Sequence, residues 1–134
     1  YLVPKISKNV SDAIRLLKFG APLNLIVLAF IIYLGPKAGA YHWAFFAVSS
    51  VFLSLTQPAV GMAFSLSNAG KALTSFNLLL FIGAFALQWI IGVIIDLTMN
   101  LGYSEISGFR FAMIFFLLTS FFSYLFFLIR NYKN

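Results

Sequence analysis

Four long apolar stretches, separated by short polar ones, run along this chain of 134 residues. A helix needs about 20 mostly apolar residues to cross the hydrocarbon core of a bilayer. We therefore predict an all-α membrane protein with a short loop at 1–10, a tail at 131–134 and transmembrane helices at 11–35, 43–66, 73–97 and 108–130. Connections this short make consecutive helices antiparallel neighbours.

Prolines predict where two of these helices bend or end. Gly35 and Pro36 should end the first helix, while Pro22 should either kink that helix or mark its start. Pro58 lies inside the second helix, where it lacks the N–H that would bond the carbonyl of Ser54. A kink is therefore expected at Pro58.

The composition supports a membrane location. Hydrophobic residues make up 62% of the chain and charged residues only 9%, against about 25% charged residues in soluble domains. A soluble chain this small has too high a ratio of surface to volume to hide so much apolar surface. The lipid bilayer is thus the first expected partner. The net charge of +6 does not indicate nucleic acid, because the basic residues flank the apolar stretches.

The basic residues also predict an orientation in the inner or plasma membrane. Four crossings put both ends of the chain on one side, and the side with more Lys and Arg is normally cytoplasmic. Seven basic residues fall on the side of the termini and two on the other, so both termini are expected in the cytoplasm. The seven are Lys5, Lys8, Arg15, Lys18, Lys71, Arg130 and Lys133, and the two are Lys37 and Arg110.

The residues available for chemistry are few. The chain has no Cys, three acidic residues and a single histidine, His42. These cannot form a metal site or an acid–base pair, so we expect no enzyme activity and no cofactor. No charged residue lies near the centre of any predicted helix, where proton relays and ion-coupling sites usually place one.

The second predicted helix is the best candidate for a functional one. Ser50, Ser54 and Gln57 are spaced by four and three residues, which places them on one face of an α-helix. Polar helices kinked by proline are tolerated where they face protein or a water-filled cavity. These three residues are our candidates for a solute path. A kinked packing helix with satisfied hydroxyls is an equally good interpretation.

The third and fourth predicted helices should have different surroundings. Small residues let helices approach closely inside a membrane, and amide side chains bond between them. We therefore expect the third helix to be buried between neighbours. The fourth is rich in Phe and poor in small residues, which favours a position at the periphery. The packing candidates in the third helix are Asn77, Gly83, Gln88 and Gly92.

Two segments resemble the major facilitator superfamily of transporters. Residues 57–97, QPAVGMAFSLSNAGKALTSFNLLLFIGAFALQWIIGVIIDL, are similar to the tenth and eleventh spans of that family. Residues 2–8, LVPKISK, resemble the second half of its cytoplasmic loop motif, with Lys5 and Lys8 at basic positions. Pro4 stands where the family has Asp, which weakens a gating role for this loop.

The resemblance implies that the chain is spans nine to twelve of a twelve-helix bundle. It would then be the C-terminal part of a secondary active transporter that moves a small solute by alternating access. Its partners would be the N-terminal spans of the same protein, the solute and, as a family-level expectation, a coupling proton. A first residue of Tyr1 instead of Met favours such a fragment.

Two other functions remain open. One is a small, complete four-span transporter of the multidrug type that works as a dimer. It would need a carboxylate inside the membrane, and the chain has none near the centre of a span. The other is a membrane scaffold that transports nothing.

The predicted orientation can be tested with two single cysteines. Gly70→Cys and Lys133→Cys should react with a membrane-impermeant thiol reagent only when the reagent is added from the cytoplasmic side. The absence of native cysteines in this chain keeps its own background low. Labelling of either position from outside would overturn the topology.

Overall fold

The computed structural model describes residues 10–132, and the predictions for Lys5, Lys8 and Lys133 lie outside this range. Within it the chain forms only helices: α2 (Val10–Leu34), η1 (Gly35–Lys37), α3 (Ala40–Ser49), η2 (Ser50–Leu55), α4 (Thr56–Ala63), α5 (Leu66–Asn100) and α6 (Glu105–Tyr132). Here η marks a 3₁₀-helix. Four segments are long and apolar enough to cross a membrane, which confirms the four predicted spans: Asp12–Lys37, Ala40–Ala63, Leu66–Asn100 and Glu105–Arg130.

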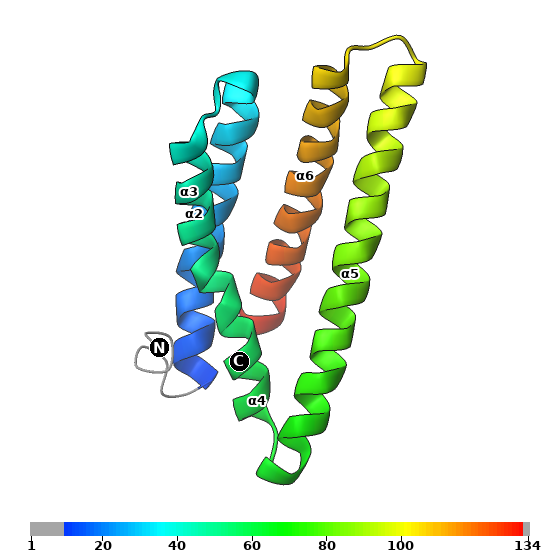
Figure 1. Ribbon diagram of the computed structural model, residues 1–134. Helices are drawn as coiled ribbons and strands as arrows, with labels where there is room; N and C mark the ends of the chain where they lie inside the picture. The colour runs from blue at the N-terminus through cyan, green and yellow to red at the C-terminus, as the bar shows by residue number, and fades with distance from the viewer. Residues whose placement is uncertain (1–9, 133–134) are drawn as a thin grey trace.

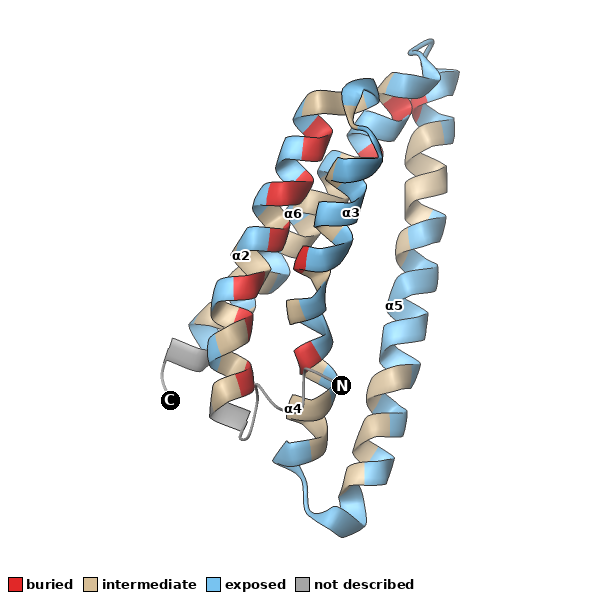
Figure 2. Cartoon of the chain, turned by 60° about the vertical axis from the view of Figure 1, so that its left-hand side comes forward, coloured by how far each residue is buried: buried red, intermediate tan, exposed pale blue. Residues whose placement is uncertain are grey.

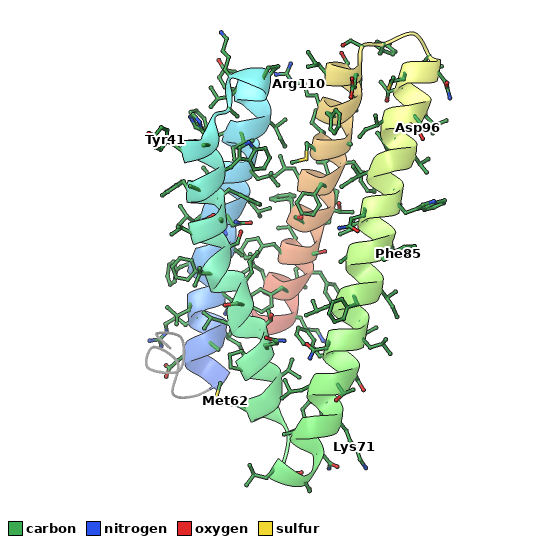
Figure 3. All side chains as sticks on the ribbon, viewed as in Figure 1. Tyr41, Met62, Lys71, Phe85, Asp96 and Arg110 are labelled. Carbon is green, nitrogen blue, oxygen red and sulfur yellow. The ribbon has the colours of Figure 1, made fainter. Side chains whose placement is uncertain are left out.

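The four spans run up and down as an antiparallel set (Figure 1). The second span consists of α3, η2 and α4, and its path bends along its length. The first residue of α2 and the last of α6 lie at the same end of the bundle, together with the connection between α4 and α5. Lys71 lies toward this end, whereas Tyr41, Asp96 and Arg110 lie toward the opposite one (Figure 3).

The observed helix ends differ from the predicted ones mainly at α5. The connection expected at 67–72 is helical, so α5 has 35 residues and only 64–65 separate it from α4. The carbonyl of Ser65 starts the helix by accepting bonds from the N–H groups of Asn68 and Ala69. Gly70 does not interrupt it, since one glycine in a helix costs only about 1 kcal/mol. At Gly35, φ is +54°, and α2 ends one residue earlier, as predicted.

The second span changes from α-helix to 3₁₀-helix before Pro58. Pro58 has no N–H, so the turn that precedes it lacks one regular bond. Serine and threonine hydroxyls in the same stretch bond to carbonyls of the preceding turn, which competes with regular α-helical bonding. Ser54 donates to Val51 O at 2.7 Å and Thr56 to Leu53 O at 2.8 Å. The distortion predicted at Pro58 is thus a six-residue 3₁₀ segment on its N-terminal side.

α2 supplies most of the buried core. It contacts α3, η2, α4 and α6, and the buried positions follow one side of it in Figure 2. The core residues of α2 repeat at helical spacing along this side. Each contact that they make with a neighbouring helix excludes lipid from both helix surfaces. The buried apolar side chains are Ala13, Leu17, Val27, Leu28, Ile31, Ile32, Leu55 and Ala112.

Gly20 is a point of close approach between α2 and η2. It is buried, and a Cβ atom at this position would overlap Cβ and Cγ of Phe52. The Cβ atom of Phe52 is bonded directly to the backbone of η2, so it cannot swing away as the end of a long side chain could. A side chain at residue 20 would therefore push η2 away from α2.

A long-range hydrogen bond joins α2 to α6. Pro22 cannot donate to the carbonyl of Lys18, which is the usual partner of residue 22 in an α-helix. The hydroxyl of Tyr124 in α6 donates to this carbonyl instead, at 2.8 Å. A lipid-facing carbonyl would have no such partner, so this bond favours docking of α6 on the Pro22 side of α2.

The relative positions of α5 and α6 differ from our expectation for the third and fourth spans. α6 contacts both α2 and α5, whereas α5 packs mainly on α4 and α6 and stands at the edge (Figure 1). Phe content is thus a poor guide to position among these four helices. Apolar side chains are exposed on both helices, and lipid or further protein can cover them in a membrane.

Gly20 offers a test of this packing. Gly20→Ala should lower the free energy of unfolding of the full-length protein in detergent by about 1–3 kcal/mol, because it overfills the contact with Phe52. Gly70→Ala is the matched control, since Gly70 is an exposed residue of α5 and no neighbouring atom lies within 4 Å of a Cβ there. Equal stability of the two variants would contradict the close α2–η2 contact.

Candidate functional site: a cavity between three spans

A cavity of about 610 Å³ lies between the first, second and fourth spans. α2, the second span and α6 supply most of its wall, and α5 contributes Leu87. On α2 and α6 the lining residues run from the middle of the helix toward the end of the bundle that carries the described termini. Its polar lining residues are Asn24, Ser50, Thr56, Thr119, Ser120, Ser123 and Tyr124.

Asn24 is the most deeply buried of these polar residues, with 6% of its surface exposed. Its side-chain nitrogen, Nδ2, donates to the hydroxyl oxygens of Ser49 and Ser50, at 2.8 Å in each case. It also lies 3.4 Å from the carbonyl oxygen of Phe46. These contacts tie α2 to the junction of α3 and η2, where the second span changes its helix type.

Our sequence analysis missed Asn24. The available signal was a lone amide within the apolar stretch 19–34. Such a residue in a membrane span must find a partner, so it marks either an interhelical contact or a cavity. The kink at Pro58 drew attention to the second span, although the first carries a buried amide that bonds to it.

The structure brings only one of the three predicted path residues to the cavity. Ser50 lines it, but Ser54 is exposed and bonded to its own helix. Our argument that offsets of four and three share a face assumed an α-helix and is wrong here. In a 3₁₀-helix residues three apart align. The lining residues of η2 and the start of α4 accordingly follow that period, at Ser50, Leu53 and Thr56.

Gln57 instead connects the second and third spans. Its Nε2 donates to Oδ1 of Asn77 at 2.8 Å, so a predicted path residue and a predicted packing residue bond each other. Gln57 is not among the residues that line the cavity. This geometry supports the packing interpretation of Gln57 over the path interpretation.

The other packing candidates lie on the open side of α5. Gly83 and Gln88 are exposed and Gly92 is half-buried, and no atom lies within 4 Å of a Cβ placed on either glycine. The burial expected for this helix is therefore not present among the four described spans. A packing role for these three residues stays a prediction that concerns protein outside residues 10–132.

A second and larger cleft, of about 890 Å³, lies at the opposite end of the bundle. Lys37 and Arg110 border it, together with apolar residues of α2 and α6. Arg110 donates to the carbonyl oxygen of Tyr33 at 3.3 Å, close to the end of α2. His42 also has a structural role at this end, since its Nδ1 accepts the N–H of Gly39 at 3.1 Å and so caps α3.

Neither cavity contains a cluster suited to metal binding. Within residues 10–132, no three His, Cys, Asp or Glu side chains come close enough to share an ion. What the cavity of about 610 Å³ offers is a mostly apolar wall with aromatic rings, in which a few hydroxyl and amide groups are set. Such a site can hydrogen-bond and enclose a small molecule, and its volume lies within the usual range for ligand pockets.

Comparisons of this chain with protein-family models, with curated proteins and with solved structures gave no match. The interpretation of the cavity therefore depends on its own geometry and on the sequence features described above.

A double-mutant cycle can test the bond between Gln57 and Asn77. Gln57→Met and Asn77→Leu should each destabilise the full-length protein, and the double variant should lose less than the sum. We expect a coupling energy of about 0.6 kcal/mol, which is typical of hydrogen bonds between membrane helices. Unfolding in bicelles gives the free energies.

Gln88→Met provides the control for this cycle. Gln88 is an exposed residue on the same helix as Asn77, and its side-chain amide makes no hydrogen bond to another described residue. Its effect should add to that of Gln57→Met without coupling. Additivity of Gln57→Met and Asn77→Leu would show that the two side chains do not interact.

Proposed function

We propose that this chain is the C-terminal part of a secondary active transporter and that the central cavity forms part of the solute path. The observation that carries this proposal is a cavity of about 610 Å³ whose mostly apolar wall contains uncharged polar side chains from three membrane spans. Polar groups are costly inside a bilayer, and those in membrane spans commonly mark a substrate or ion pathway. Helix packing alone does not require so many hydroxyls around one space.

The segments that resemble the major facilitator superfamily support the same proposal. In that interpretation the four spans are the ninth to twelfth helices of a twelve-helix bundle. The exposed side of α5, including Gly83 and Gln88, is then available to the N-terminal spans of the same protein. The small solute would cross by alternating access, with a proton as the expected coupling ion.

The distribution of charge supports the orientation included in the proposal. Among the described residues, Arg15, Lys18, Lys71 and Arg130 lie toward the end that carries the described termini. Lys37 and Arg110 lie toward the other end, which also has Asp96 and Glu105. An excess of basic residues favours the cytoplasmic side, so we assign the end with the termini to the cytoplasm of the inner or plasma membrane.

Alternating access can be tested before any solute is identified. Ser123→Cys places one thiol in the cavity wall of a full-length protein from which other cysteines have been removed. A charged, impermeant methanethiosulfonate reagent reacts with thiols that water reaches, because the thiolate is the reactive form. In a transporter, Ser123→Cys should be labelled both in right-side-out and in inside-out vesicles.

Phe122→Cys is the matched control, because residue 122 is adjacent on α6 and its side chain is largely exposed on the outside of the bundle. It should remain unlabelled in both kinds of vesicle, since lipid surrounds it. Labelling of Ser123→Cys from one side only, or from neither, would reject alternating access. Such a result would favour the non-transporting scaffold.

A further inference from the structure

The hydrogen bonds around Asn24 fix the direction of its amide group. The hydroxyls of Ser49 and Ser50 both donate to the carbonyl oxygen of Phe46, at 2.8 and 2.9 Å. Their hydrogens are thereby used, so toward Asn24 they present only lone pairs and require a donor. Nδ2 must therefore face the two serines, and the amide oxygen, Oδ1, must face away from them.

This oxygen is available to a ligand. No described residue donates a hydrogen bond to Oδ1 of Asn24, although the residue as a whole is nine-tenths buried. No buried side-chain nitrogen or oxygen in the described part of the chain is sealed off without a partner. Since Asn24 lines the cavity, its free acceptor must open into that space.

The wall formed by α6 supplies complementary groups. Thr119 uses its hydroxyl on the carbonyl of Phe115 at 2.6 Å, and Tyr124 uses its own on Lys18. Ser120 and Ser123 also line the cavity, and neither hydroxyl makes a hydrogen bond to another described residue. Each of these two hydroxyls can donate one hydrogen bond and accept others. The cavity thus offers one fixed acceptor and two adaptable hydroxyls.

No charged residue lines this space, which bears on the charge of its occupant. An ion that enters a membrane-embedded cavity loses much of its hydration, and uncharged hydroxyls and amides compensate this loss poorly. A neutral molecule with O–H or N–H groups loses far less and regains hydrogen bonds from the wall. The rings of Phe46, Phe116 and Phe127 can cover its less polar faces.

We propose that the cavity binds an uncharged solute rich in hydroxyl or amide groups, and that Asn24 determines this specificity by accepting a hydrogen bond from the solute at Oδ1. This inference rests on the proposed transport function, because it names the class of solute that would occupy the same path. Ser120 and Ser123 position the solute from the opposite wall.

Protection of a cavity cysteine can test this class of solute. The full-length protein carrying Ser123→Cys is treated with the methanethiosulfonate reagent in the presence of neutral probes: glucose, mannitol or nicotinamide. Gluconate and glucosamine serve as charged probes of similar size. At least one neutral probe should slow labelling at millimolar concentration, and the charged probes should not.

Variants of the wall then test the role assigned to each residue. Asn24→Leu removes the acceptor and should raise the half-protecting concentration of the neutral probe at least about tenfold, as expected for one lost hydrogen bond. Asn24→Leu also removes the hydrogen bonds to Ser49 and Ser50. Ser120→Ala is therefore a second variant, which leaves the hydrogen bonds among Asn24, Ser49 and Ser50 intact. It should weaken protection in the same direction.

Ser54→Ala is the matched control, because its hydroxyl lies outside the cavity and is bonded to Val51. It should leave protection unchanged. Protection only by a charged probe, or by no neutral probe, would overturn the proposed solute class even if Ser123→Cys is labelled from both sides. Protection that survives both Asn24→Leu and Ser120→Ala would remove these residues from the site. Failure of two-sided labelling itself would instead reject the transport function.

Discussion

Lipid tails offer no hydrogen bonds, so every polar group inside these spans must be satisfied by the protein or by water in a cavity. This constraint accounts for several of the contacts between helices. The Lys18 carbonyl, which Pro22 leaves without its usual donor, is bonded by Tyr124 of α6. Asn24 bonds the second span, and Gln57 bonds Asn77 of α5. Polar pairs of this kind fix which side of each helix faces its neighbours, where apolar packing alone would allow several rotations.

The same constraint shapes the candidate site. Proline and hydroxyl groups convert part of the second span into a 3₁₀-helix, and its period of three aligns Ser50, Leu53 and Thr56 along the cavity. Close approach at Gly20 holds this segment against α2. Asn24 then meets the hydroxyls of Ser49 and Ser50, whose geometry turns its oxygen toward the open space. The position of Oδ1 of Asn24 therefore depends on the 3₁₀-helix of the second span and on the absence of a side chain at Gly20. It also depends on the two hydrogen bonds from Ser49 and Ser50 to the carbonyl of Phe46.

The number and approximate extent of the spans could be predicted from sequence, because hydropathy over about 20 residues reports on the membrane itself. The end of α2 at Gly35 was predictable for a local reason as well. The face of the second span was not, since a change from 3.6 to 3.0 residues per turn increases the angle between Ser54 and Ser50 around the helix axis from about 40° to about 120°. The hydrogen-bond partner of Gln57 could not be predicted either, because it depends on how α4 and α5 pack against each other. Asn24 was visible as a lone amide, but its partners were not.

The bond between Tyr124 and Lys18 joins residues that lie 106 positions apart. Ribosomes add about 5–20 residues per second, so roughly 5–20 s separate the synthesis of the carbonyl from that of the hydroxyl that completes it. During this interval the carbonyl of Lys18 has neither the N–H that Pro22 lacks nor the hydroxyl of Tyr124. Water or lipid headgroups can bond that carbonyl in place of Tyr124 until α6 arrives. The order of synthesis thus delays completion of this contact of the first span until the last one is made.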